Sequence, residues 1–161
     1  MDTELATLSR QVGDALARRG WLLAAAESCT GGWIAEVVTA TAGSSAWFDR
    51  GFVTYSNVAK TEMLGVSAAT LGSAGAVSIA TVGEMAQGAQ ARSAAQIAVA
   101  VSGVAGPTGG SAEKPVGMVC LAWAWGDGQL DAETCHFAGD REAVRRQTVI
   151  RALEGVLVRC G

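Results

Sequence analysis

Two apolar runs constrain the fold more than any other feature of the sequence. "WLLAAA" (residues 21–26) and "IAVAV" (residues 97–101) contain no charged side chain, and both are far shorter than the roughly 20 residues that a membrane-spanning helix needs. Strands that form continuous apolar runs are typical of sheets covered by helices on both faces. The two runs therefore predict a buried central sheet and argue against membrane insertion.

Segments with helical spacing of apolar residues alternate with the strands. The pattern predicts helices at residues 3–19, 33–40, 58–64, 79–93 and 141–160, with Asn57, Ser78 and Asp140 as N-caps of the last three. A polar connection is expected between Gly65 and Ser78. "GFVTYS" (residues 51–56) is a further strand, and "GDGQ" (residues 126–129) joins two strands in a hairpin. The order predicts a single domain over residues 1–161, a three-layer α/β/α sandwich with a mixed, mostly parallel sheet.

Composition limits the classes of partner. The chain has 161 residues, of which 50% are hydrophobic and 17% charged, and its net charge is −3. The apolar composition and five tryptophans favour a homodimer or a higher homo-oligomer, and the absence of a basic excess disfavours nucleic acid as a ligand. The acidic N-terminus "MDTEL" does not resemble a secretory signal, so a cytoplasmic location is expected. Four cysteines without CxxC spacing and a single histidine argue against a metal site and for buried thiols.

The segment "ESCTGG" places three hydroxyl or thiol groups between a strand and a helix. Ser28, Cys29 and Thr30 are followed by Gly31 and Gly32; the glycines allow close approach of a substrate, and free N–H groups of such a turn stabilise negative charge. Taken alone, the segment is better interpreted as an ordinary turn in which Thr30 serves as a cap.

A nucleophilic serine also needs a base, and lysines are scarce. Lys60 and Lys114 are the only two in the chain. Lys60 follows the strand that ends near Tyr55, so both residues reach the crevice beside Ser28 if the two strands are neighbours; a solvated helical lysine is the common alternative. Lys114 ends "SAEK", which matches an S-x-x-K pattern only by chance because Pro115 makes a helix there improbable.

Two further segments could bind an anion. "GVAGPTGG" (residues 103–110) lacks both the P-loop ending and the Rossmann order of glycines, so it is only a weak motif and also fits a flexible connection. Arg141 and Arg145 are four residues apart on the last predicted helix and share a face, which suits a phosphate or carboxylate. A surface on which Glu142 and Glu154 pair with these arginines is the alternative.

Together, "AESCTGG", "FVTYSNVAK", "SGVAGPTGG" with "EKPVG", and "GDREAVRRQ" closely resemble the family of nicotinamide mononucleotide amidohydrolases, the C-terminal domain of the competence-damage-inducible protein CinA. The resemblance covers nearly the whole chain in order. The family also occurs fused behind a pyrophosphatase-like domain that 161 residues cannot accommodate, so the stand-alone form is expected. The implied activity is deamidation of nicotinamide mononucleotide to nicotinate mononucleotide and ammonia in pyridine nucleotide salvage, without metal or cofactor.

The resemblance also implies roles for individual residues. Ser28 is the implied nucleophile, Lys60 its base, and Tyr55 a support for proton transfer or for Lys60, while Cys29 stays a rival nucleophile. Arg141 and Arg145 are the expected phosphate ligands. Backbone amides of the turn at residues 28–32 or of the glycine loop are the candidates for an oxyanion hole, so the expected substrate-binding set includes Cys29, Thr30, Gly31, Gly32, Gly103, Ala105 and Gly106. A nucleotide-binding, competence-linked regulatory module without turnover, or a different amide substrate, is the alternative.

Overall fold

The computed structural model describes all residues, 1–161, and contains one five-stranded sheet with strand order β2-β1-β3-β4-β5. β1 (Leu23–Glu27) pairs in parallel with β2 (Phe48–Val53) and with β3 (Ile97–Gly103). β4 (Met118–Trp125) runs antiparallel to β3 and forms the predicted hairpin with β5 (Gln129–His136). The sheet is therefore mixed, as predicted, and four of its five strands share one direction.

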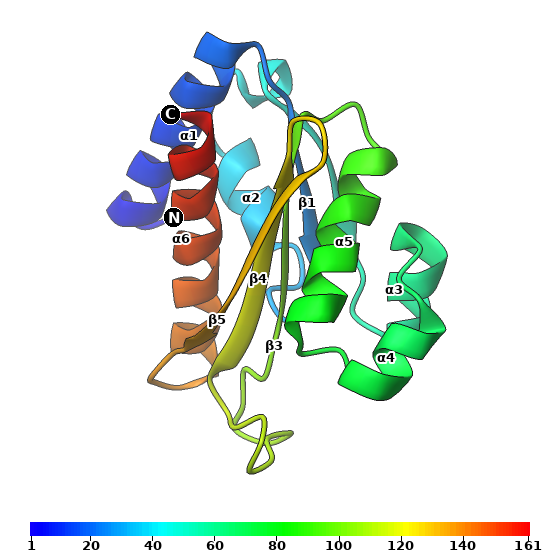
Figure 1. Cartoon of the computed structure of the whole chain (residues 1–161). Coiled ribbons are helices and arrows are strands. Elements are labelled where there is room, and N and C mark those ends of the chain that lie inside the picture. Colours follow the sequence, from blue (N-terminus) through cyan, green and yellow to red (C-terminus); the bar gives the residue numbers. More distant parts are fainter.

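Helices cover both faces of this sheet (Figure 1). One face is packed by α1 (Thr3–Arg19), α2 (Trp33–Thr39) and α6 (Arg141–Cys160). The other carries α5 (Ile79–Ala91), flanked by α3 (Asn57–Leu64) and α4 (Ala68–Ala74). The three-layer α/β/α sandwich is thus confirmed. No helix is both long enough and apolar enough to cross a membrane.

The two faces of the sheet differ in side-chain size. Successive residues of a strand point to opposite faces, and in β3 this places Ile97, Val99 and Val101 in the core beneath α1, α2 and α6. Ala98 and Ala100 point to the α5 side. The small side chains let α5 lie close to the sheet, while the larger ones fill the opposite layer.

Several local expectations need correction. The Gly65–Ser78 connection contains helix α4, which Ser67 caps through bonds to the Ala69 and Thr70 N–H groups. The N-cap of α3 is Ser56 rather than Asn57, because the Ser56 hydroxyl accepts the Ala59 N–H. β2 lies three residues earlier than predicted, since Asp49 and Arg50 interrupt the apolar pattern without leaving the strand. The capping interactions of Ser78 and Asp140 are confirmed.

Candidate active site

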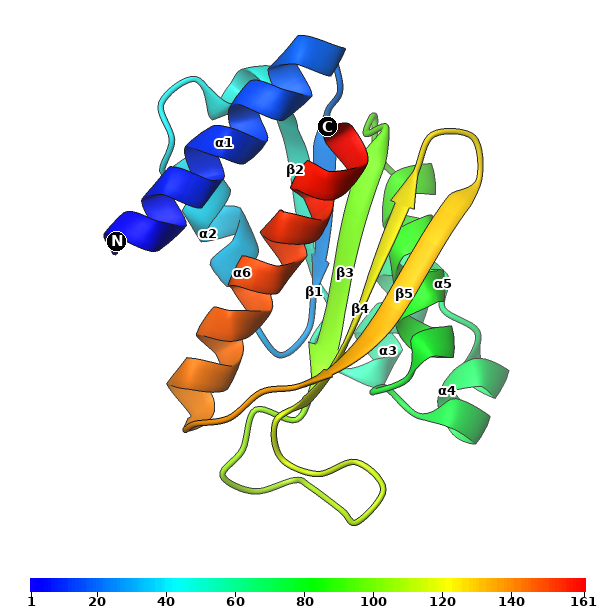
Figure 2. The same ribbon diagram turned by 60° about the vertical axis from the view of Figure 1, so that its left-hand side comes forward.

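Three parallel strands end at the same edge of the sheet, together with the glycine loop and the N-terminus of α6 (Figure 2). Ser28 directly follows β1. Its N–H donates to the Val101 carbonyl on β3 at 3.2 Å, and the Glu27 carbonyl accepts the Thr54 N–H from the β2 side at 2.8 Å. The predicted neighbourhood of the two strands is confirmed, and the backbone that carries Ser28 is anchored on both sides.

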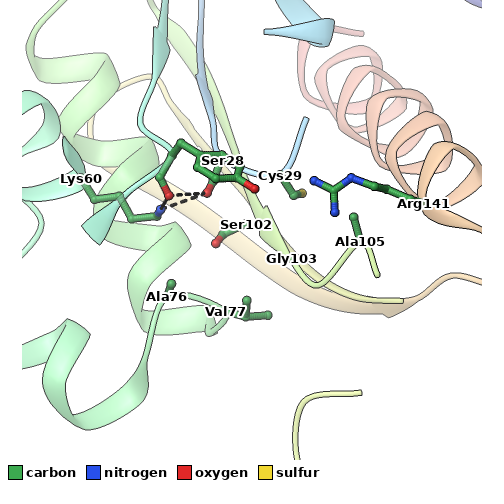
Figure 3. A pocket seen from close by; sticks show the side chains of 10 residues that line it. Ser28, Cys29, Lys60, Ala76, Val77, Ser102, Gly103, Ala105 and Arg141 are labelled. Carbon is green, nitrogen blue, oxygen red and sulfur yellow. Dashed lines mark hydrogen bonds between the residues drawn. The ribbon is translucent and has the colours of Figure 1, made fainter. Parts of the chain in front are cut away.

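Lys60 reaches Ser28 from the first half of α3. Its Nζ lies 2.9 Å from Ser28 Oγ and 3.0 Å from the Tyr55 carbonyl oxygen (Figure 3). The Thr54 carbonyl oxygen is also 2.9 Å from Nζ. Lys60 is 1% exposed and has no carboxylate partner. Burial therefore lowers its pKa from the usual value.

The three neighbours of Nζ suit a neutral amine as well as an ammonium. A neutral amine has two N–H donors and one lone pair; the two carbonyls take both donors, and the lone pair then faces the Ser28 hydroxyl. In this state the serine O–H donates a hydrogen bond to the lysine nitrogen, which is the geometry that a general base requires. The pair can therefore exchange a proton with no other group involved.

The two other residues implied for chemistry occupy different positions. Cys29 is buried, which raises the pKa of its thiol to about 11 and keeps it protonated near neutral pH. Tyr55 is 64% exposed, and only its carbonyl contacts Lys60, while its side chain borders the cavity. Thr30 is fully buried and donates to the Glu27 carboxylate at 2.6 Å, so it does not cap α2 as predicted.

A cavity of about 190 Å³ lies in front of Ser28 (Figure 3). Gly103 and Ala105 of the glycine loop and Arg141 of α6 border it, as expected of a binding site. The sequence interpretation did not include three more lining residues, which are Ala76, Val77 and Ser102. Ser102 begins the "SGVAGPTGG" segment at the end of β3, and this position in a family motif could have indicated it as a lining residue. Ala76 and Val77 carry no such signal.

Glu27 is a further residue that the sequence interpretation missed. Its carboxylate is fully buried and accepts the N–H groups of Ile34 and Ala35 as well as the Thr30 hydroxyl. It therefore satisfies N–H groups of the first turn of α2, whose N-cap, Gly32, has no side chain to do so. A single carboxylate between an apolar strand and the start of a helix could have indicated this role from the sequence.

The two arginines predicted on one face of α6 make different contacts. Arg141 is exposed and donates to the Gly106 carbonyl at 2.8 Å. Arg145 donates to the Cys29 and Thr30 carbonyls, each at 3.0 Å, and its guanidinium lies 5.3 Å from the centre of the Trp33 ring. Neither arginine forms a salt bridge with Glu142 or Glu154.

Gly31 and Gly32 both adopt positive φ, which a residue with a Cβ rarely tolerates.

Backbone donors remain available on both predicted segments. The N–H groups of Cys29 and Thr30 make no hydrogen bond to another residue, nor do those of Ala105 and Gly106. No three His, Cys, Asp or Glu side chains gather as metal ligands. The site thus combines a buried serine–lysine pair, unpartnered amides and a guanidinium without a carboxylate partner, which are parts of an acyl-transfer site.

Comparison with known proteins agrees with the fold and with the order of the motifs. The CinA C-terminal domain model matches residues 5–160. Nicotinamide-nucleotide amidohydrolase PncC of Escherichia coli K12 is 56% identical over 153 residues, covering 95% of this chain and 93% of the relative, and the Pseudomonas putida protein of the same name is 57% identical over 154 residues, covering 95% of each chain.

Solved structures give the same result. The crystal structure of competence/damage inducible protein CihA from Agrobacterium tumefaciens superposes with a TM-score of 0.96 at 46% identity, covering 98% of this chain and 96% of that one. A family match over nearly the whole sequence, relatives above 50% identity and a shared fold lead to one conclusion. The chain belongs to the CinA C-terminal domain family.

Proposed function

We propose that this protein hydrolyses the carboxamide of nicotinamide mononucleotide to give nicotinate mononucleotide and ammonia, using Ser28 as nucleophile and Lys60 as base. The substrate class follows from the PncC relatives, which are named nicotinamide-nucleotide amidohydrolases. The observation that carries the mechanism is the 2.9 Å contact between Lys60 Nζ and Ser28 Oγ at the wall of a cavity.

The proposed reaction proceeds through an acyl-enzyme. Neutral Lys60 takes the Ser28 proton while Oγ attacks the carboxamide carbon, and the carbonyl oxygen becomes an oxyanion that backbone N–H groups stabilise. The Lys60 ammonium then gives its proton to the departing nitrogen, and ammonia leaves with the electrons of the C–N bond. Lys60 next activates a water molecule, whose attack releases the carboxylate and restores Ser28.

The cavity walls suggest how the nucleotide would bind. The nicotinamide ring would occupy the space in front of Ser28, between the Ala76–Val77 segment and the glycine loop. Arg141 borders both this cavity and a neighbouring hollow with Trp33 and Glu142. Its guanidinium, which has no carboxylate partner, would bind the 5′-phosphate there, because the planar fork of N–H groups fits phosphate oxygens. A cytoplasmic location and a homo-oligomeric state remain predictions.

The direct test is ammonia release from nicotinamide mononucleotide by the purified protein and by two variants. Ser28→Ala should lower kcat by roughly 10³-fold or more, because the nucleophile is lost. Cys29→Ala should stay within about threefold of the native rate, because a protonated, buried thiol contributes no nucleophile. Full turnover in Ser28→Ala together with an inactive Cys29→Ala would reverse the assignment. Tight binding of the nucleotide without ammonia release by the native protein would instead favour the regulatory module.

A further inference from the structure

Arg145 is bonded to the backbone of the nucleophile turn, residues 28–32, at two points. Its Nε donates to the Cys29 carbonyl and its NH2 group to the Thr30 carbonyl, both at 3.0 Å. Helix α6 thereby contacts a turn that lies 116 and 115 residues earlier in the chain. A guanidinium that holds two consecutive carbonyls fixes the orientation of both peptide planes.

The orientation of those planes determines where the neighbouring N–H groups point. In a trans peptide the N–H and C=O vectors are opposed, so the bond to the Cys29 carbonyl directs the Thr30 N–H away from Arg145. The Gly31 N–H, which shares a plane with the Thr30 carbonyl, donates to the Ser28 carbonyl at 3.1 Å. The N–H groups of Cys29 and Thr30 immediately follow the proposed nucleophile and have no partner in the chain.

Arg145 itself is held in place and its charge is not neutralised. The guanidinium lies against the Trp33 ring, and no carboxylate lies within salt-bridge distance of it. A cation bonded to a peptide carbonyl polarises that peptide and strengthens its N–H as a donor. On the other side of the turn, the Glu27 carboxylate holds the Thr30 side chain. The turn is therefore fixed between a carboxylate and a guanidinium.

Arg141 differs from Arg145 in each of these respects. Its single bond goes to Gly106, and it borders the cavity that contains Ser28. Arg145 borders only the neighbouring hollow, and two of its donor groups are already used by the turn. The arginine better placed for a substrate phosphate is thus Arg141.

We infer that Arg145 is a positioning residue and not a ligand of the substrate phosphate. Through the Cys29 carbonyl it orients the Thr30 N–H toward the developing oxyanion. Through the Thr30 carbonyl it fixes the Gly31 peptide, whose N–H holds the Ser28 carbonyl and with it the plane of the Cys29 N–H. The inference rests on the proposed function for its substrate. It separates two arginines that the sequence treats as equivalent.

Two substrates distinguish positioning from phosphate binding. Arg145→Gln should lower kcat by about 10- to 100-fold for nicotinamide mononucleotide and by the same factor for nicotinamide riboside, which lacks the phosphate, with KM changed less than about threefold. Arg141→Gln, the matched comparison, should raise KM for the mononucleotide several times more than KM for the riboside, because only the mononucleotide carries the phosphate. An Arg145→Gln defect that lies in KM for the mononucleotide and disappears with the riboside would overturn the inference.

A covalent probe tests the positioning independently of the substrate. A small uncharged fluorophosphonate reacts with serine by forming an Oγ–P bond and releasing fluoride, and its phosphoryl oxygen uses the same N–H donors. Intact-mass measurement should show Ser28 labelled at least about tenfold more slowly in Arg145→Gln than in the native protein, with partial recovery in Arg145→Lys, which keeps the charge. Equal labelling rates, in variants whose unfolding temperature matches the native one, would refute the inference even if the proposed substrate is wrong.

Discussion

At the scale of single residues, the surroundings of Lys60 determine what its amine can do. Family resemblance and the scarcity of lysines indicate Lys60 as a base. The sequence does not indicate that the residue is 1% exposed, nor that its companions are two carbonyl oxygens and no carboxylate. A carboxylate at that distance would hold the lysine in its ammonium form. Burial without a carboxylate partner instead lowers the pKa of Lys60, so the neutral amine forms at a lower pH than in a solvated lysine.

The lowered pKa of Lys60 predicts a pH dependence. Only the neutral amine accepts the serine proton, so kcat/KM for nicotinamide mononucleotide should rise with pH and then reach a plateau. The midpoint of the rise should equal the Lys60 pKa and lie below 10.5. A pH–rate profile of the native protein measures this midpoint. A rate independent of pH, or a midpoint above 10.5, would contradict the assignment of Lys60 as base.

The control for the pH profile is the stability of Lys60→Met. The pKa of Lys60 is lower in the folded than in the unfolded chain, so the ammonium destabilises the folded state at every pH below the folded pKa. The native protein should therefore gain unfolding free energy relative to Lys60→Met as the pH rises through that pKa toward 10.5. Equilibrium urea unfolding at several pH values measures this difference.

At the scale of helices and strands, one glycine inside a helix marks a close approach between layers. Gly155 of α6 lies against the indole of Trp123 on β4, and a Cβ added there would be 2.1 Å from the ring. The Trp123 N–H also donates to the Ala152 carbonyl of the same helix at 3.0 Å. Packing against the sheet therefore explains why α6 has a glycine at this position. The sequence of the helix alone does not indicate it.

A pair of glycine substitutions tests this packing. Gly155→Ala should lower the unfolding free energy by at least about 2 kcal/mol, because the clash with Trp123 outweighs the better helix propensity of alanine. Gly72→Ala in α4 is the matched control: no atom lies within 4 Å of the added Cβ, so it should raise stability by up to about 1 kcal/mol. Urea unfolding with unchanged m-values gives both numbers. Equal effects of the two substitutions would show that α6 does not pack this closely.

At the scale of the whole molecule, the cavity is built from both helix layers. Arg141 joins the glycine loop to α6 through Gly106. Lys114, in the continuation of that loop toward β4, bonds the Ala74 carbonyl at the C-terminal end of α4. Ala105 of the loop and Val77 beyond α4 both line the cavity. Lys114, whose S-x-x-K match is accidental, thus connects two walls of the site.

Removing this connection should weaken substrate binding. Lys114→Met should raise KM for nicotinamide mononucleotide by roughly 3- to 10-fold and change kcat less, because the loop loses the bond that orders it before binding. Steady-state kinetics measures both constants. The neighbouring Glu113→Gln, on the exposed side of the loop, is the control and should match the native protein. An unchanged KM in Lys114→Met would exclude a role of this bond in shaping the cavity.

The sequence by itself determined the order of helices and strands apart from α4, the mixed sheet and the residues available for chemistry. These properties follow from local periodicity, turn residues and motifs, each of which is written within a few neighbouring positions. The tertiary structure alone decided which groups meet: Lys60 with Ser28, Arg145 with the nucleophile turn, and Ala76 and Val77 with the cavity. Such contacts join segments up to 116 residues apart, and they depend on how the layers pack. Arg141 and Arg145 look alike on a helical face, and only the position of α6 against the end of β1 separates their roles.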